Sequence, residues 1–100
     1  MYGTIFTMKV KPGQHKKVAE AFDRWDRERK PKLKGALASL LMKPDAKTRD
    51  LIGVAVFEDR ETYEANAGDP EQDKWFRGLR ELLEADPDWE DGEFLAGTVG

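Results

Sequence analysis

Two short segments of this 100-residue chain, 36–43 (ALASLLMK) and 51–58 (LIGVAVFE), are apolar on both faces of an extended backbone. The rows of the second segment are Ile52, Val54 and Val56 on one face, and Leu51, Gly53, Ala55 and Phe57 on the other. In the first segment, one face carries Ala36, Ala38, Leu40 and Met42, and the other face carries Leu37 and Leu41. Because side chains alternate between the faces of a strand, both segments are predicted to be strands that need apolar cover on two sides.

The first third of the chain predicts one more strand and a long helix. Residues 2–10 alternate, and one face carries Tyr2, Thr4, Phe6, Met8 and Val10. Residues 14–30 have helical spacing, with a stripe of His15, Val18, Phe22 and Trp25. Pro31 is expected to end this helix. The polar connection 44–50 is short, which favours an antiparallel hairpin between 36–43 and 51–58.

The second half of the chain predicts two helices and a last strand. Residues 58–68 indicate a short helix that Asp59 caps and Gly68 ends. Asp69, Pro70 and Gln72 have the spacing of a capping box, which predicts a helix that continues to about Asp86. Its expected core stripe is Trp75, Phe76, Leu79, Leu82 and Leu83. Residues 93–99 (EFLAGTV) are predicted to be the final strand.

This order of elements predicts a single α+β domain over residues 1–100, with the ferredoxin-like βαββαβ arrangement and a four-stranded antiparallel sheet. Its helices can cover only one face of the sheet. Each large apolar side chain left wet on the other face would forgo about 1.5–3 kcal/mol, against a total stability of about 5–15 kcal/mol. No segment is left to cover that face, so a second copy is expected there, giving a homodimer that closes into a dimeric α+β barrel.

Composition excludes several classes of function. The net charge is −3; residues 9–34 carry ten Lys or Arg against four acids, and residues 58–93 carry fourteen acids against four bases. The cations alternate with acids along the first helix, which argues against a nucleic-acid surface. The chain has no cysteine and no apolar run of membrane-spanning length, so neither a disulfide framework nor a membrane partner is expected, and a cytoplasmic location is predicted.

Several residues on the sheet are small: Gly3, Ala36, Ala38, Gly53 and Ala55. They could leave room inside the barrel for a flat ligand beside Phe57 or Trp75, or they could only let the sheets approach closely. The sequence leaves both interpretations open.

The order of the pieces resembles the antibiotic biosynthesis monooxygenase-like family of dimeric α+β barrels. The similarity lies in VKPGQHKKVAEAF, in RERKPKLKGALASLLMKPD and in VAVFEDRETYEANAGDP, which together span most of the chain. It implies a homodimer with one pocket between sheet and helices in each subunit. Members of this family include monooxygenases that oxidise polycyclic aromatic compounds without metal or flavin, and heme-degrading enzymes. Many have no known activity, so the fold does not decide the function.

The chain departs from that family at two positions. Phe57 stands where members commonly have tryptophan, and Asn66 stands where many have histidine. An amide cannot titrate or serve as the axial ligand of heme, so neither heme nor another cofactor is expected. Asn66 could hold a substrate oxygen and stabilise an enolate, and Tyr63 could add a phenolic hydrogen bond. Alternatively Asn66 ends the helix in a left-handed conformation and Tyr63 packs on the sheet.

The remaining candidates are weaker. His15 is the one group expected to titrate near neutral pH and is a candidate general base. The acids Asp88, Glu90, Asp91 and Glu93 lack a neighbouring histidine, so they are expected to be solvated and no metal site is predicted. Asn66, Tyr63, Phe57 and Trp75 are the expected ligand-binding residues. The predicted function is binding of a small aromatic or quinone-like molecule, with cofactor-independent monooxygenation as its chemistry; the alternative is a non-catalytic binding or interaction module.

Overall fold

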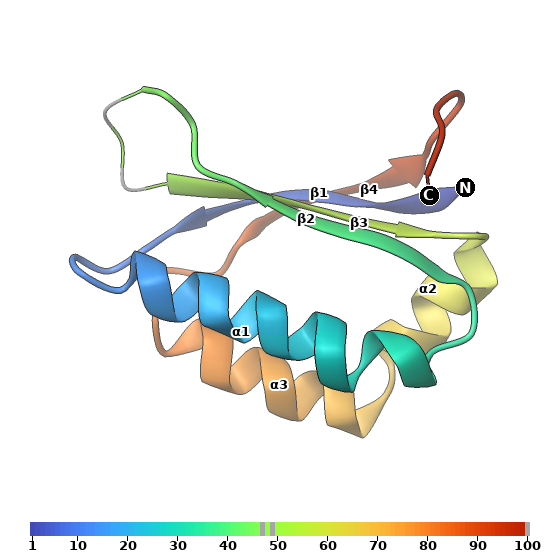
Figure 1. The fold of residues 1–100 in the computed structure, drawn as a ribbon, viewed down its shortest axis with the longest axis horizontal. Helices are drawn as coiled ribbons and strands as arrows, with labels where there is room; N and C mark the ends of the chain where they lie inside the picture. Colours follow the sequence, from blue (N-terminus) through green and yellow to red (C-terminus); the bar gives the residue numbers. More distant parts are fainter. Residues whose placement is uncertain (47, 49, 100) are drawn as a thin grey trace.

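The computed structural model describes residues 1–46, 48 and 50–99 and forms two layers, with a sheet on one side and helices on the other (Figure 1). The elements are β1 Tyr2–Lys9, α1 His15–Glu28, the 3₁₀ turn η1 Lys30–Lys32, β2 Ala36–Met42, β3 Asp50–Phe57, α2 Arg60–Ala67, α3 Pro70–Arg80 and β4 Asp88–Glu93. In the predicted turn at 44–50, residues 47 and 49 lie outside the described residues.

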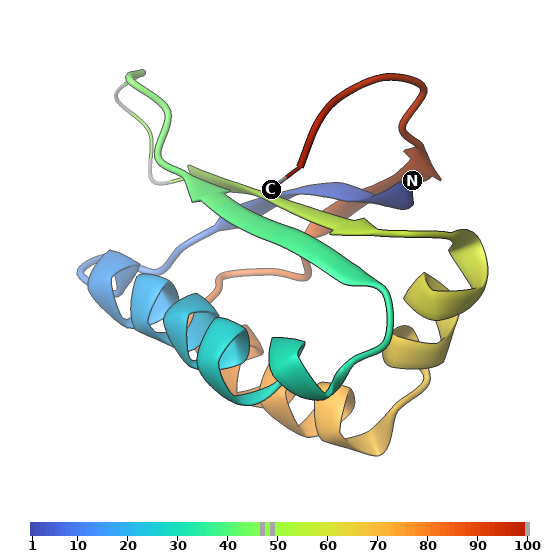
Figure 2. The ribbon, with the colours of Figure 1, turned by 45° about the vertical axis from the view of Figure 1, so that its right-hand side comes forward.

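The four strands form one antiparallel sheet in the order β2-β3-β1-β4. The helices α1, α2 and α3 lie against the same face of this sheet, and the turned view shows the sheet above them (Figure 2). The predicted ferredoxin-like α+β arrangement is therefore confirmed. Asp59 and Thr62 form the capping box that starts α2, and Gly68 caps its end, as the sequence indicates.

The main core lies between the sheet and helices α1 and α3. It consists of Phe6, Met8, Val10, Val18, Ala21, Phe22, Leu51, Leu79 and Leu83, all less than 9 % exposed. The alternating row of β1 and the i, i+3, i+7 row of α1 both point into this layer, which is why the two periodicities predict their elements correctly. Pro31 lies in η1, directly after the end of α1.

Residues 81–99 depart from the prediction in two ways. Helix α3 ends at Arg80 rather than near Asp86, although Leu82 and Leu83 still pack on the core through the turn that follows. The last strand is Asp88–Glu93, five residues earlier than predicted, and residues 94–99 lie outside it. The apolar letters of 94–99 favoured the later strand, but β4 is an edge strand whose side chains are all exposed, so it needs no apolar row.

The face of the sheet that turns away from the helices is only partly covered. Leu40 is 64 % exposed, Met42 is 53 % exposed and Ile5 is 42 % exposed on this face. The expectation that no chain segment is left to cover it is wrong. The backbone N–H of Phe94 donates to the Met1 carbonyl, and the Phe94 ring lies within van der Waals reach of Gly3, so the tail covers one end of the face.

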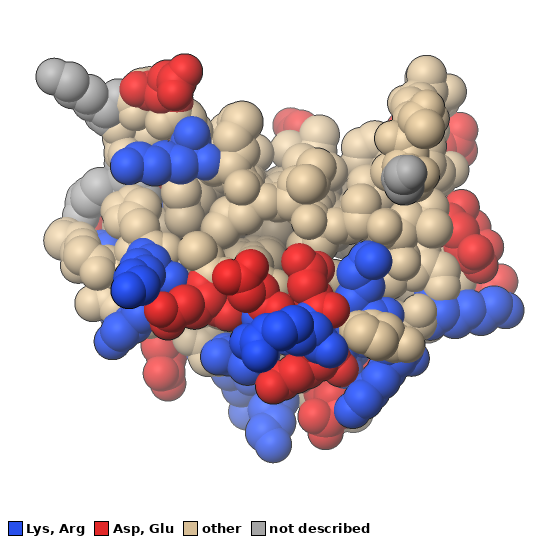
Figure 3. All heavy atoms as spheres, in the orientation of Figure 1, with Lys and Arg blue, Asp and Glu red and all other residues tan. Residues whose placement is uncertain are grey.

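Charged side chains gather over the helices, while the region around the strands shows few of them (Figure 3). The ion pair between Arg29 and Asp69 joins the basic first half of the chain to its acidic second half within one subunit. Among the described residues, no helix is long and apolar enough to cross a membrane.

Two glycines provide a test of this packing. A Cβ at Gly53 would overlap the ring of Phe6, whereas a Cβ at Gly78, on the exposed face of α3, would meet nothing within 4 Å. We expect Gly53→Ala to lower the free energy of unfolding by about 1–3 kcal/mol through overpacking. Gly78→Ala should raise it by about 0.5–1 kcal/mol, because alanine favours the helix. Urea unfolding followed by circular dichroism measures both; equal effects would contradict the packing of Phe6 on β3.

Candidate functional site

A cavity of about 420 Å³ lies between the sheet and the helices. From the sheet its lining includes Thr4, Phe6, Ser39, Ala55, Phe57, Trp89 and Asp91, and from the helices Phe22, Trp25, Tyr63, Asn66, Ala67, Gln72, Asp73, Trp75, Phe76 and Leu79. Every strand and each of α1, α2 and α3 contributes. The volume is within the range of small-molecule sites.

The lining of the cavity is mainly aromatic. All aromatic residues of the chain except Tyr2 and Phe94 contribute to it. The rings of Phe22 and Trp75 meet edge to face at 5.2 Å, and those of Phe57 and Tyr63 do so at 5.6 Å. Such rings present flat apolar faces and hold one another in place, so the shape is suited to a planar ligand.

The exposed side of the cavity runs along β4. Trp89 is 47 % exposed and its ring centroid lies 6.0 Å from that of Phe76 on α3. Asp91, two residues further along β4, is also exposed. The charged residues in the lining are Asp73 and Asp91, and Asp73 is paired with Arg77 at 3.0 Å. This side of the cavity is therefore bordered by aromatic rings and the carboxylate of Asp91.

Asn66 is a buried residue of α2, 9 % exposed, and it lines the cavity. Its side-chain oxygen accepts a hydrogen bond of 2.7 Å from Nη2 of Arg29. The prediction that Asn66 ends its helix in a left-handed conformation is wrong, because no residue other than glycine has a positive φ in the described part of the chain. The helix ends instead at Gly68, whose N–H bonds back to the carbonyls of Glu64 and Asn66.

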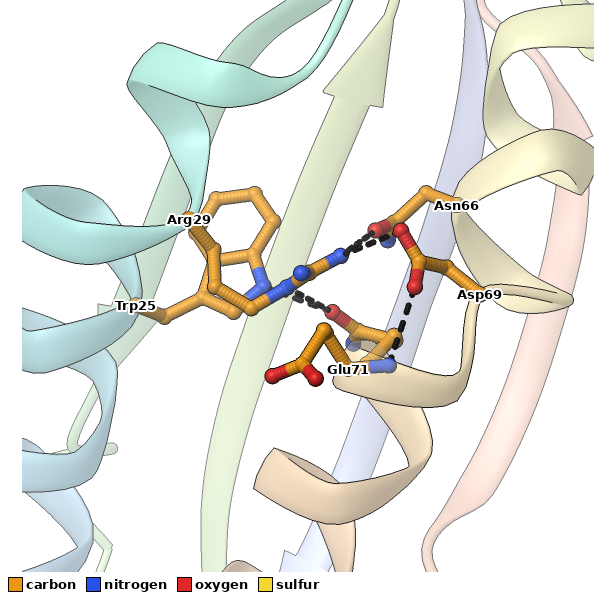
Figure 4. Close-up of polar contacts among 6 residues, drawn as sticks. Trp25, Arg29, Asn66, Asp69 and Glu71 are labelled. Carbon is orange, nitrogen blue, oxygen red and sulfur yellow. Dashed lines mark hydrogen bonds and ion pairs between the residues drawn. The ribbon is translucent and has the colours of Figure 1, made fainter.

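Arg29 follows the last turn of α1 and reaches the junction of α2 and α3, where Figure 4 shows it facing Asn66 and Asp69. Its side chain is 13 % exposed, and its Nη2 lies 3.5 Å from the Asp69 carboxylate. Its Nε donates to the side-chain oxygen of Gln72 at 3.2 Å, and Nε1 of Trp25 donates to the same oxygen at 2.8 Å. One guanidinium thus ties three helices together.

The predicted capping box at the start of α3 is only half correct. Asp69 does cap the helix, since its carboxylate accepts from the N–H of Glu71, and Pro70 is the first helical residue. The side chain of Gln72 does not reach back to the cap. It binds Trp25 and Arg29, because these donor-only side chains from α1 lie beside it.

Tyr63 on α2 donates its hydroxyl proton to Oδ1 of Asp91 on β4, at 2.9 Å. Burial of the phenol, and then its hydrogen bond to the Asp91 carboxylate, raise the pKa of Tyr63 from 10.0 to about 12. The hydroxyl is therefore a permanent donor at neutral pH. Asp91 is one of the acids expected to be solvated, and its role in orienting Tyr63 was not foreseen.

The structure brings four of the five predicted site residues to one cavity: Phe57, Tyr63, Asn66 and Trp75. His15, the candidate base, is the first residue of α1 and lines neither this cavity nor the second one described below. The sequence reading missed Trp25, Gln72, Trp89 and Asp91 as lining residues, and Arg29 as their support. Trp25 could have been found from the helical stripe of α1, whereas Trp89 lies in a polar strand without apolar alternation. The contacts of Arg29 span 37 to 43 positions and leave no local signal.

A second, polar cavity of about 270 Å³ is lined by Lys32, Leu33, Lys34, Glu58, Asp59, Glu61, Thr62, Ala65, Asn66 and Asp69. Asn66 is common to both cavities. Among the described residues, no group of three or more His, Cys, Asp or Glu side chains is arranged to hold a metal ion.

Comparison with known proteins gives a consistent picture of the fold. No family model and no curated protein matches the sequence. A candidate antibiotic biosynthesis monooxygenase from Caulobacter crescentus aligns over 95 % of this chain and 90 % of its own, with 14 % identity and a TM-score of 0.83. The chain has the antibiotic biosynthesis monooxygenase-like fold.

Two further solved structures with the antibiotic biosynthesis monooxygenase-like fold are informative. A candidate monooxygenase from Chloroflexus aurantiacus is 18 % identical, with a TM-score of 0.77, over 97 % of this chain and 95 % of its own. SnoaB from Streptomyces nogalater, a cofactor-independent oxygenase, is 15 % identical, with a TM-score of 0.78, over 96 % of this chain and 94 % of its own. The SnoaB structure is of a variant in which an asparagine is replaced by alanine. At these identities the likeness shows the fold.

The raised pKa of Tyr63 has a consequence for stability. Because the folded protein holds the phenolic proton more tightly than the unfolded chain, this stabilisation is present below pH 10 and is lost as the pH rises from 10 to about 12. We expect the difference in unfolding free energy between the wild type and Tyr63→Phe to shrink over that interval. Urea unfolding at a series of pH values measures it. A constant difference would show that the phenol is not perturbed, since all other groups titrate in both proteins.

Proposed function

We propose that the protein binds a planar aromatic molecule in the cavity and oxygenates it without a cofactor, as the named activity of SnoaB suggests. The observation that carries this proposal is the convergence of aromatic rings from every layer on one cavity of about 420 Å³, with the buried amide of Asn66 in its wall. The cavity argues against a module whose interior is filled, whereas a non-catalytic binding module would use the same cavity and is distinguished by its lack of catalysis.

In the proposed reaction the substrate itself supplies the electrons that reduce dioxygen. A methylene flanked by two aromatic rings that are conjugated to a carbonyl loses a proton to give an enolate, which can transfer electrons to dioxygen. One oxygen atom ends as a new carbonyl and the other leaves as water, so CH₂ + O₂ gives C=O + H₂O. Asn66 would stabilise the enolate oxygen, and the carboxylate of Asp91 is the proton acceptor that we assign in the lining.

We further propose a homodimer in which the exposed sheet faces of two subunits pack together. Leu40, Met42 and Ile5 supply the apolar surface, and burying each would contribute about 1.5–3 kcal/mol. The tail beyond β4 covers one end of this face, so the contact would centre on β2 and β3.

Filling the cavity should block binding. Ala55 lies on the inner face of β3 in the lining, so Ala55→Phe would place a ring where the ligand lies. We expect the affinity for naphthalene, measured by equilibrium dialysis, to fall about tenfold or more, a loss of about 1.4 kcal/mol or more. Ala19→Phe, at an exposed position of α1 outside the cavity, is the matched control and should bind as the wild type does. Equal affinity of all three proteins would place the ligand elsewhere.

The oxygenase proposal is tested with anthrone, whose central methylene has the required acidity. We expect the wild type to consume oxygen in equal amount to the anthraquinone formed, after subtraction of the spontaneous reaction. Asn66→Ala should lower kcat by about 10²-fold, the usual effect of removing one donor to a developing oxyanion. If the wild type retains naphthalene but does not accelerate this oxidation, the binding module is the correct function.

The dimer is tested by introducing a charge on the exposed sheet face. Leu40→Glu would bury a carboxylate in the proposed contact, so it should dissociate the dimer in sedimentation experiments. Lys16→Glu, on the exposed side of α1, makes an acid at a distant surface and should leave the dimer intact. A monomeric wild type would refute the sheet-to-sheet contact.

A further inference from the structure

We propose that Asn66 and Gln72 form a two-donor clamp for an acceptor oxygen of the ligand, such as a quinone carbonyl or an enolate, and that Arg29 is the residue that sets its polarity. This inference rests on the proposed function, because it concerns the same cavity. It adds a second ligand-binding residue and a positioning residue outside the lining.

The first step concerns the two amide oxygens. Arg29 donates from Nη2 to the oxygen of Asn66 at 2.7 Å and from Nε to the oxygen of Gln72 at 3.2 Å. Trp25 donates to the same Gln72 oxygen. Guanidinium and indole groups have no acceptor, so the oxygen of each amide, and not its NH₂ group, must face them. The donor-only partners therefore fix which end of each amide faces Arg29 and Trp25.

The second step concerns the two amide nitrogens. Neither has a hydrogen-bond partner in the described part of the chain, and neither is sealed away as a buried unpaired atom. Asn66 is 9 % exposed and Gln72 is half-buried, and both line the aromatic cavity. A donor in such a wall is costly to leave unpaired once a ligand excludes water. The wall is thus complementary to an acceptor on the ligand.

The third step concerns charge. The guanidinium of Arg29, only partly balanced by Asp69 at 3.5 Å, lies behind both amides. Its positive charge favours electron-rich oxygen at the clamp, and it polarises the two amides in the same direction. A ligand that presents a hydroxyl donor at this point would meet no acceptor. The clamp thereby distinguishes a carbonyl or an enolate from a hydrocarbon of the same shape.

The test uses 1,4-naphthoquinone and naphthalene, which share a ring system and differ by two carbonyl groups. Asn66→Asp and Gln72→Glu keep an oxygen for Arg29 but replace the NH₂ donor by an oxygen. We expect each variant to lose about tenfold or more in naphthoquinone affinity, measured by equilibrium dialysis, with naphthalene affinity unchanged. Arg29→Met should reduce the ratio of the two affinities, because the amide of Asn66 is then free to rotate, although Trp25 still donates to the oxygen of Gln72. The chain has no cysteine to react with the quinone.

Gln14→Glu makes the same chemical change outside the cavity and controls for the added charge. Thermal unfolding shows which variants are folded, and Gln72→Glu tests the clamp even if Asn66→Asp is unstable. An unchanged affinity ratio in folded Gln72→Glu would overturn the clamp and leave the proposed aromatic site standing. Failure of the wild type to bind either compound would overturn the proposed function and this inference with it.

Discussion

The geometry of the aromatic cavity depends on the hydrogen bonds of one guanidinium. Arg29 comes from the end of α1, yet its donors are used by Asn66 on α2 and by Gln72 and Asp69 at the start of α3. These contacts fix where the end of α1, the helix α2 and the start of α3 meet. They therefore also set the distance between the helix layer and the sheet at this junction. Because the side chain is largely shielded from water, the removal of any one partner would leave a buried charge or amide without its full set of hydrogen bonds.

The rest of the cavity follows from an imbalance between the two layers. Helices α1 and α3 pack on the central strands through the core around Phe6 and Leu79, while β4 stands at the edge with its side chains exposed. Trp89 and Asp91 thus line a space that no helix fills. A space of this kind between two packed layers lowers the stability of the fold relative to a filled core. The rings that line this space hold one another in place, and this is the structural basis of the proposal that it binds a ligand.

The sequence was sufficient for the architecture and for part of the site, for identifiable reasons. Alternation and helical spacing report which face of an element is buried, so they put Phe57 in one row with Leu51 and placed Trp75 on the core stripe of α3. The two periodicities failed where pairing at the edge of the sheet, or a contact with a residue distant in the sequence, determines the structure. Residues 88–93 form a strand through pairing with β1 despite a polar composition, and Gln72 binds Trp25, 47 positions away, instead of its own helix cap. His15 was placed on the correct stripe of α1, but at the end about 20 Å from the junction with α2.

The aromatic lining also gives the molecule a built-in optical signal. Trp25, Trp75 and Trp89 are all the tryptophans that the chain possesses, and all of them face the same cavity. Their indole emission therefore arises entirely from the wall of the site, with no background from elsewhere in the subunit. A quinone that accepts energy or electrons from excited indoles would quench the fluorescence of all three tryptophans when it bound in the cavity. Ligand binding could therefore be screened with unlabelled protein by following its intrinsic fluorescence.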